Sequence, residues 1–253
     1  MDLGIQDRTV LVTGGSSGIG AAIARGFAAE RARVAITYGS DRESALSLAR
    51  ELGSEQGRAI AVRYSLSDPA TVAAAVEEVA RRWGSVDILV ANAVRWAPRR
   101  GADMRFEDVA PAEWKAFLDD NLPPTLQTVQ LAVGAMRPRK WGRIVLISSH
   151  VANDGHLGQE FYGATKSALH GFARSLSWDV GRDGVLVNVV APGLTTTDRV
   201  RAGLPVAIQS RELDRTPTGR LSAPRDVAAA VVFLCSAAND NITGQILTVA
   251  GGR

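Results

Sequence analysis

A glycine-rich turn between a β-prone apolar run and a helix-prone segment is the feature that most constrains the fold. Residues 9–12 are mostly apolar, and residues 21–28 carry apolar side chains at helical spacing. Between them, Gly14, Gly18 and Gly20 follow the pattern G-x-x-x-G-x-G. Glycines allow a tight turn and a close approach of the backbone to a pyrophosphate, whose charge the free N–H groups of the next helix favour. The segment therefore predicts the first strand, turn and helix of a dinucleotide-binding fold.

Apolar segments of β type alternate with segments of helical period along the chain. Strands are expected at residues 9–12, 34–37, 59–63, 86–91, 143–148, 185–191 and 246–249, and helices at 18–30, 41–53, 69–83, 111–137, 161–181 and 224–237. Such alternation is typical of a parallel sheet with helices on both faces. We predict one α/β domain over residues 1–253, a Rossmann-like, doubly wound sheet of about seven parallel strands. Ligands of such sheets bind beyond the carboxyl ends of the strands.

The bulk properties exclude several functional classes. Apolar residues make up 46% of the chain and charged residues 22%, which is ordinary for a globular domain. No apolar run approaches the ~18 residues of a membrane helix, and no basic-then-apolar leader opens the chain. The net charge of +3 is spread along the sequence, which does not call for a nucleic-acid partner. We expect a cytoplasmic protein without a membrane partner.

Metal and thiol chemistry are not expected either. The chain has three histidines and one cysteine, with no spacing typical of metal ligands. Cys235 follows an apolar run, and we interpret it as a small core side chain rather than a nucleophile.

Tyr162 and Lys166 are separated by one helical turn within the helix expected at 161–181, so they share one face. A free tyrosine has a pKa of about 10. A nearby ammonium favours the phenolate and lowers that pKa into the range of general acid–base catalysis. Ser149, which follows the strand expected at 143–148, can hydrogen-bond the same substrate oxygen. These three side chains predict proton transfer at a carbonyl or an alcohol.

With both motifs present, the chain resembles the short-chain dehydrogenase/reductase family in its single-domain form. The resemblance covers nearly the whole chain and is carried by residues 13–20, Asn92-Ala93, Asn121, Ser149, Tyr162 with Lys166, the segment 192–197 and the closing segment 242–252. It implies that Ser149, Tyr162 and Lys166 are catalytic. It further implies that Asn121 helps to hold a water that links the lysine to bulk solvent. A dimer or tetramer built through the helices near 111–137 and 161–181 is implied as well.

The resemblance also implies the residues that bind the cofactor. They are Gly14, Ser16, Ser17, Gly18, Ile19, Gly20, Tyr38, Ser40, Arg42, Asn92, Tyr162, Lys166, Pro192, Gly193, Thr195 and Thr197. Tyr38 stands where users of NAD place an acid. Ser40 and Arg42 can bind a 2′-phosphate, while Asp41 can cap the next helix. We therefore predict NADP(H) in preference to NAD(H).

Two departures from the family pattern carry structural expectations. Pro123 and Pro124 lie inside the helix expected at 111–137, so a kink or bulge is expected near Asn121. Such a distortion serves either a proton relay or packing. Val94 replaces a glycine of the family and brings bulk close to the cofactor ribose and the mouth of the substrate site.

Three segments are expected to bound the substrate: 94–106, 150–160 and 194–216, the last as a mobile lid. Their apolar members, Trp96, Leu194 and Leu204, suit a bulky hydrophobic ketone such as a polycyclic polyketide intermediate. His150 directly follows Ser149 and is a further candidate for substrate contact. Packing of Trp96 and a structural role for His150 are the alternatives.

Arg99 and Arg100 offer a second interpretation of the substrate. They can contact the phosphopantetheine or the acidic surface of an acyl carrier protein, as in the β-ketoacyl reductases that the chain also resembles. The simpler alternative is a solvated loop.

The function predicted from these residues is an NADPH-dependent ketoreductase with Tyr162 as proton donor, acting on a small-molecule ketone, with a polyketide or other secondary-metabolite intermediate as the leading substrate. The alternatives are a β-ketoacyl carrier-protein reductase, an NAD-dependent alcohol dehydrogenase, a dehydratase or isomerase using the same tyrosine, and a non-catalytic NADP(H)-binding sensor or scaffold. The intact Ser149, Tyr162 and Lys166 argue against the last of these.

Overall fold

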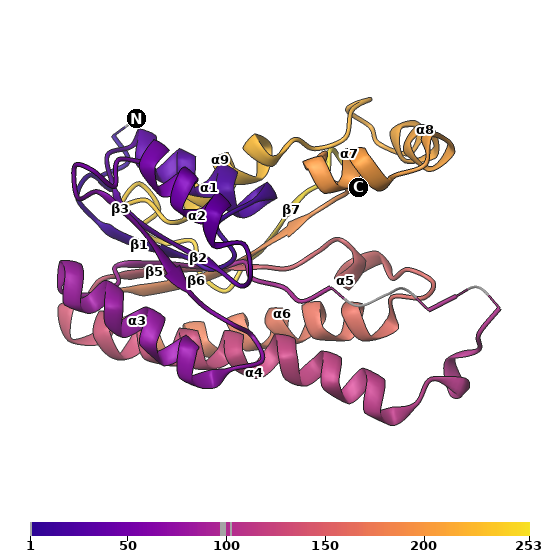
Figure 1. Ribbon diagram of the computed structural model, residues 1–253, viewed down its shortest axis with the longest axis horizontal. Coiled ribbons are helices and arrows are strands. Elements are labelled where there is room, and N and C mark those ends of the chain that lie inside the picture. Colours follow the sequence, from indigo (N-terminus) through magenta and orange to yellow (C-terminus); the bar gives the residue numbers. More distant parts are fainter. Residues whose placement is uncertain (1, 97–99, 102) are drawn as a thin grey trace.

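Seven parallel strands form one sheet in the order β3-β2-β1-β4-β5-β6-β7 (Figure 1). The structure is a computed structural model and describes residues 2–96, 100–101 and 103–253. The strands are β1 Thr9–Val12, β2 Arg33–Tyr38, β3 Ala59–Arg63, β4 Ile88–Ala91, β5 Gly142–Ile147, β6 Val185–Pro192 and β7 Ile246–Val249. The predicted sheet is confirmed, and every strand end lies within about two residues of its expected place, the usual uncertainty of such boundaries.

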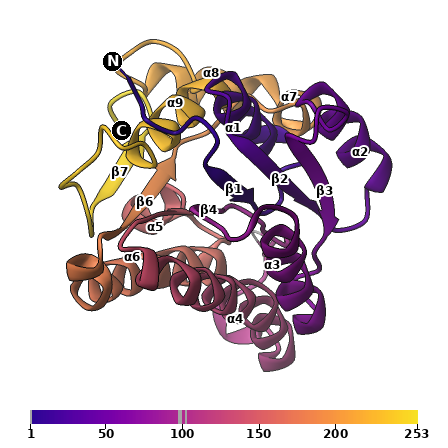
Figure 2. The same cartoon turned by 90° about the vertical axis from the view of Figure 1, so that its left-hand side faces the viewer.

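Helices cover both faces of the sheet (Figures 1 and 2). One face packs against α1 Gly18–Ala29, α2 Arg42–Glu51 and α9 Pro224–Leu234, and the other against α3 Pro69–Trp83, α4 Pro111–Met136 and α6 Glu160–Val180. The central strands β1, β4, β5 and β6 are buried along their whole length. This burial on both faces explains why their sequences are mostly apolar rather than alternating, with buried polar exceptions such as Arg143 of β5 and Asn188 of β6.

Three short helices were not anticipated: α5 Val151–Asp154, α7 Asp198–Gly203 and α8 Val206–Asp214. Single 3₁₀ turns lie at Phe106–Asp108, Arg137–Arg139 and Gly181–Asp183. Neither α7 nor α8 buries a side chain, so neither carries the apolar stripe by which a packed helix is found in a sequence.

Pro123 and Pro124 do not end α4, which continues through both of them as one helix, and the expected kink near Asn121 stays a prediction. The carbonyls that lose an N–H partner to the prolines belong to the residues four positions earlier, not to Asn121. The Asn121 carbonyl accepts a hydrogen bond from Thr125 Oγ1 at 2.8 Å. Bonds from a threonine hydroxyl to the carbonyl four residues earlier often bend a helix slightly.

Adjacent strands β1 and β4 connect to opposite sides of the sheet, so a crevice opens at their carboxyl ends.

The turn after β1 requires its glycines. Gly14 and Gly18 have φ of +60° and +53°, and a Cβ on Gly20 would lie 2.3 Å from the Gly14 carbonyl oxygen. A side chain at these positions would force the turn away from the crevice.

No helix in the described part of the chain is long and apolar enough to cross a membrane.

On the outer surface, Trp178 of α6 is 89% exposed and Leu131 of α4 is also exposed. These two apolar side chains lie on the helices for which subunit contacts are expected.

Candidate active site

The turn that follows β1 is held in shape by side chains from β1 and from the end of β4. Asn92 Nδ2 donates to the carbonyl oxygens of Thr13 and Gly14, both at 3.0 Å. Thr13 Oγ1 accepts from the backbone N–H groups of Asn92 and Ala93, both at 3.0 Å. Asn92 therefore supports the dinucleotide turn. Thr13, which was not among the predicted site residues, shares that role.

The turn leads directly into the N-terminus of α1, as a phosphate cradle requires. Ser17 is the N-cap residue of α1, and its side chain makes no capping hydrogen bond. A Cβ on Gly18 would lie 3.3 Å from Thr197 Cγ2, so the segment after β6 closes over the turn. Glycines, a helix N-terminus and a neighbouring hydroxyl residue fit the pyrophosphate of a dinucleotide.

The end of β2 is where the cofactor's ribose is expected. Asp41 is the N-cap of α2 and accepts a hydrogen bond from the Ser44 N–H at 3.0 Å. These bonds hold the pKa of the Asp41 carboxyl below its ordinary value. Ser40 and Arg42 are exposed, and Tyr38 is half-buried. The expected capping role of Asp41 is confirmed, and it leaves Ser40 and Arg42 as the polar groups available there.

The catalytic candidates meet at the carboxyl end of β5. Ser149 follows that strand, and its side chain hydrogen-bonds the phenol of Tyr162 on α6. Lys166, one turn further along α6, donates from Nζ to the Ile147 carbonyl oxygen at 2.8 Å. The lysine nitrogen lies 5.9 Å from the centre of the Tyr162 ring. The fold thus brings the three predicted side chains together.

The charge state of this group differs from the expectation. Burial raises the pKa of the Tyr162 phenol, and the hydrogen bond from Ser149 opposes that rise only in part. The expected lowering of this pKa is therefore wrong for this state, because desolvation has the largest effect on the phenol. Burial also lowers the pKa of Lys166 from 10.5 to about 8. At neutral pH the tyrosine holds its proton and the lysine is mostly charged.

A second layer fixes Lys166 against the sheet. Ser148 Oγ donates to the Lys166 carbonyl oxygen at 3.1 Å and lies 2.8 Å from His170 Nε2. His170 lies one turn beyond Lys166 on α6. Neither Ser148 nor His170 was predicted. The repeat of Tyr162, Lys166 and His170 at four-residue intervals was the available signal.

Asn121 does not line the cleft. It is buried on α4, where its Oδ1 accepts from the Arg95 N–H at 2.9 Å and its Nδ2 donates to the Arg95 and Phe117 carbonyl oxygens. Its amide thus ties the loop after β4 to α4. The proton relay to solvent remains a prediction.

A cleft of about 1450 Å³ opens above the catalytic group. Its lining contains Ser149, Tyr162 and Lys166, the predicted substrate residues Trp96, His150, Leu194 and Leu204, and the predicted cofactor residues Ile19, Asn92, Pro192, Gly193, Thr195 and Thr197. The remaining predicted cofactor residues, on the turn and at the end of β2, lie outside it. All three segments expected to bound the substrate contribute to the wall, as does Val94.

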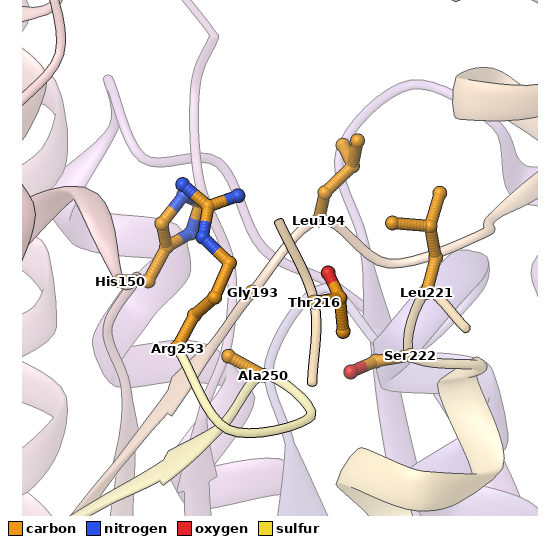
Figure 3. A pocket seen from close by; sticks show the side chains of 8 residues that line it. All are labelled: His150, Gly193, Leu194, Thr216, Leu221, Ser222, Ala250 and Arg253. Carbon is orange, nitrogen blue, oxygen red and sulfur yellow. The ribbon is translucent and has the colours of Figure 1, made fainter. Parts of the chain in front are cut away.

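A small side pocket of this cleft contains His150 (Figure 3). Leu194 and Leu221 line its opposite side, with Arg253 next to the imidazole. Burial lowers the pKa of His150, although its hydrogen bond to the Pro192 carbonyl oxygen opposes this. A neutral imidazole therefore stands beside Ser149 at neutral pH.

Trp96 lies directly against Tyr162. The indole stacks on the Tyr162 ring with centroids 5.4 Å apart and an interplanar angle of 19°. The guanidinium of Arg199 from α7 lies 5.0 Å from the centre of the indole. Trp96 is still 52% exposed. Part of the indole is thus already in contact with Tyr162 and Arg199 in this arrangement.

Arg100 is held by partners within the chain. Its side chain is only 11% exposed and forms an ion pair with Glu160 at 2.7 Å. The guanidinium also donates to the Met104 carbonyl oxygen, and its hydrogen bond holds the pKa of Glu160 below its ordinary value. Because Arg100 also lines the cleft, its contact with a phosphopantetheine or a carrier protein stays a prediction. Arg99 lies outside the described residues.

Among the described residues, no group of His, Cys, Asp and Glu is arranged to hold a metal ion. Cys235 is buried, and burial raises the pKa of its thiol, which disfavours the reactive thiolate.

Comparisons with known proteins agree with this geometry. Residues 14–253 match the family described as enoyl-(acyl carrier protein) reductase. The 3-oxoacyl-(acyl-carrier-protein) reductase FabG of Aquifex aeolicus is 37% identical over 100% of this chain and 99% of its own. The (2S)-((R)-hydroxy(phenyl)methyl)succinyl-CoA dehydrogenase subunit BbsD of Thauera aromatica is 36% identical over 99% and 98%. A solved 7α-hydroxysteroid dehydrogenase, complexed with NADH and 7-oxo glycochenodeoxycholic acid, is 30% identical with a TM-score of 0.90, covering 99% of this chain and 96% of its own.

Proposed function

The chain belongs to the short-chain dehydrogenase/reductase family, and we propose that this NAD(P)-dependent oxidoreductase of CH–OH and C=O groups reduces 3-oxoacyl thioesters with NADPH. The observation that carries the proposal is the group of Ser149, protonated Tyr162 and buried Lys166 at the floor of an open cleft. A phenol that keeps its proton at neutral pH is suited to donate that proton to a ketone oxygen.

Each of the three side chains has its own role in the proposed reaction. A reduced nicotinamide cofactor, when bound at this edge of the sheet, supplies the hydride. Tyr162 gives its proton to the oxygen on which negative charge develops, and Ser149 hydrogen-bonds that same oxygen. The Lys166 ammonium favours the phenolate that remains. Because Lys166 is buried and Tyr162 is half-buried, water screens this interaction less than it would at the surface.

The thioester proposal replaces the polyketide interpretation as the leading one. Trp96 already contacts Tyr162 and Arg199, which weakens the argument for a polycyclic ketone stacked on its indole. Arg211 and Arg215 line the cleft from the lid, and their charge suits the phosphate of a pantetheine arm. Two relatives are named for acyl-carrier-protein and CoA substrates. A polyketide reductase and an NAD-dependent alcohol dehydrogenase remain the alternatives.

The proposal is tested by steady-state rates of NADPH oxidation with acetoacetyl-CoA, with a 3-oxoacyl carrier protein, and with the bicyclic ketone 1-decalone. We expect kcat/KM for the thioesters to exceed that for decalone at least about tenfold, the ratio set by ~1.4 kcal/mol of transition-state binding. The product should gain two hydrogens by mass. Loss of water would instead indicate a dehydratase, and no turnover of any ketone would indicate a binding protein. A preference for decalone would restore the polyketide interpretation.

Cofactor preference is tested at Tyr38. We expect Tyr38→Asp to weaken NADPH binding roughly 10- to 100-fold and to strengthen NADH binding, because a carboxylate there repels a 2′-phosphate and accepts from a 2′-hydroxyl. Fluorescence titration at one salt concentration measures both affinities. Tyr38→Phe is the matched control and should keep the wild-type preference. An unmodified protein that binds NADH more tightly than NADPH would contradict the assignment.

A further inference from the structure

The segment 194–216, here called the lid, forms the wall of the cleft that faces the catalytic group. Its helices α7 and α8 lie beyond the edge of the sheet in Figure 1. Neither helix buries any residue, and none of their residues belongs to the hydrophobic core. The lid is therefore not held in place by apolar packing, which normally fixes a helix on a protein body.

One ion pair connects α8 to the body instead. Arg253 Nη1 contacts Glu212 Oε2, and the two side chains are only 16% and 17% exposed. Within the described residues, this is the one ion pair that joins α8 to another part of the chain. The other arginines of α8 and its C-cap, Arg211 and Arg215, form none there. Since the pair is shielded from solvent, it is screened less than a surface pair.

The backbone that carries Arg253 is fixed by tight packing. Gly251 and Gly252 have φ of +68° and +104°, which favours glycine. A Cβ on Gly251 would lie 2.5 Å from Thr218 Oγ1, and one on Gly252 would lie 2.8 Å from Pro217 Cγ. The Thr218 N–H donates to the Gly251 carbonyl oxygen at 3.1 Å. The segment after β7 is thus locked against the residues that follow the lid.

This packing places the Arg253 guanidinium between the lid and the residues that follow β5. In Figure 3 it lies beside the imidazole of His150, the residue after Ser149. Arg253 therefore contacts α8 through Glu212, and it also lies next to His150 in the wall of the cleft. Leu204 and Ile208, which line the cleft from the lid, depend on the position that α8 takes.

We propose that Arg253 is a positioning residue that holds lid helix α8 over the substrate cleft through its ion pair with Glu212. The ion pair sets the distance between the lid wall and the catalytic group, and so the fit of the acyl substrate. The kinetic part of this inference rests on the proposed function, whereas its structural part does not.

The test uses the full chain and the variants Arg253→Ala, Glu212→Gln and Arg253→Lys. For Arg253→Ala and Glu212→Gln we expect KM for acetoacetyl-CoA to rise about tenfold, because the pair lies between the exposed and buried limits for ion pairs. The Kd for NADPH should stay within about twofold, since a contact on the substrate side should not alter cofactor binding. Arg253→Lys keeps the charge and should restore most of the wild-type KM. Hydrogen exchange of the amides in residues 206–214 should become faster in the alanine variant and stay unchanged in the sheet.

Arg201→Ala is the matched control, because Arg201 pairs within α7 with Asp198 and does not line the cleft. The proposal is overturned if Arg253→Ala leaves both the KM and the exchange of α8 at wild-type values. Amide exchange in the sheet should not change. If exchange becomes faster throughout the protein in Arg253→Ala and again in Glu212→Gln, the residue has a general structural role and the inference is overturned. If acetoacetyl-CoA is not a substrate, the exchange measurement still decides the lid contact, and only the proposed function fails.

Discussion

Replacing Tyr162 with phenylalanine is expected to lower kcat for ketone reduction at least about 10³-fold, within the range that a positioned general acid contributes. The substitution removes the one proton that the buried phenol offers to the substrate oxygen, together with the hydrogen bond to Ser149. The ring remains to stack on Trp96, so the cleft should keep its shape. Stopped-flow or steady-state rates measure the loss, and fluorescence titration should show an NADPH affinity within about twofold of wild type, since the cofactor contacts are retained.

Tyr64→Phe provides the matched control. Tyr64 is a buried tyrosine away from the cleft, and its hydroxyl lies 2.8 Å from Thr128 Oγ1 on α4. Its loss should cost stability by about 1 kcal/mol, as for one buried hydrogen bond, with little effect on kcat. Full activity in Tyr162→Phe would remove the basis of the catalytic assignment.

Lys166→Ala is expected to lower kcat/KM by about 10²- to 10⁴-fold, a loss of the size seen when acid–base machinery is disabled. The ammonium lies 5.9 Å from the centre of the Tyr162 ring, and its Nζ is fixed by the Ile147 carbonyl oxygen at 2.8 Å. Lys140→Ala is the control, because Lys140 forms a surface ion pair with Asp183. An alanine variant at position 166 that keeps wild-type turnover would contradict the role.

The pH dependence of the wild-type enzyme tests the same residue without a substitution. Because burial lowers the pKa of Lys166 to about 8, the ammonium is charged below that pH and neutral above it. Tyr162 keeps its proton across this range, since its pKa is raised above the ordinary value. The kcat/KM for NADPH, which reports groups of the free enzyme, should therefore be constant at lower pH and fall as the pH rises through about 8. A profile that is flat to pH 10 would show that the lysine charge is not needed.

The placement of the candidate catalytic side chains could be predicted from the sequence, but their protonation could not. Helical and strand periods fix which residues share a face or an edge, and so they predicted that Tyr162 and Lys166 lie together and that Ser149 follows a strand. The direction of the Tyr162 pKa shift could not be predicted in this way. It depends on how completely neighbouring segments exclude water, and that is set by packing between parts of the chain far apart in sequence.

The same division holds for the substrate wall. Trp96, Leu194 and Leu204 were placed correctly at the cleft, because they follow strands whose carboxyl ends meet at one edge. The ion pair of Arg100 was not foreseen, since its partner Glu160 lies 60 positions further along the chain. Arg199 and Arg253 were missed because an isolated arginine carries no local pattern, and only the folded chain shows what it touches.

The sequence by itself determined the order of the strands and of the helices that cover the sheet, the glycine-rich turn and the candidate catalytic side chains. These follow from short-range chemistry: glycine backbone freedom, apolar periodicity and the fixed spacing of a helix. The tertiary structure alone decided the protonation of Tyr162, the unbroken path of α4 and the attachment of the lid. Each of these depends on burial or on a contact between distant segments, for which a linear pattern contains no measure of distance.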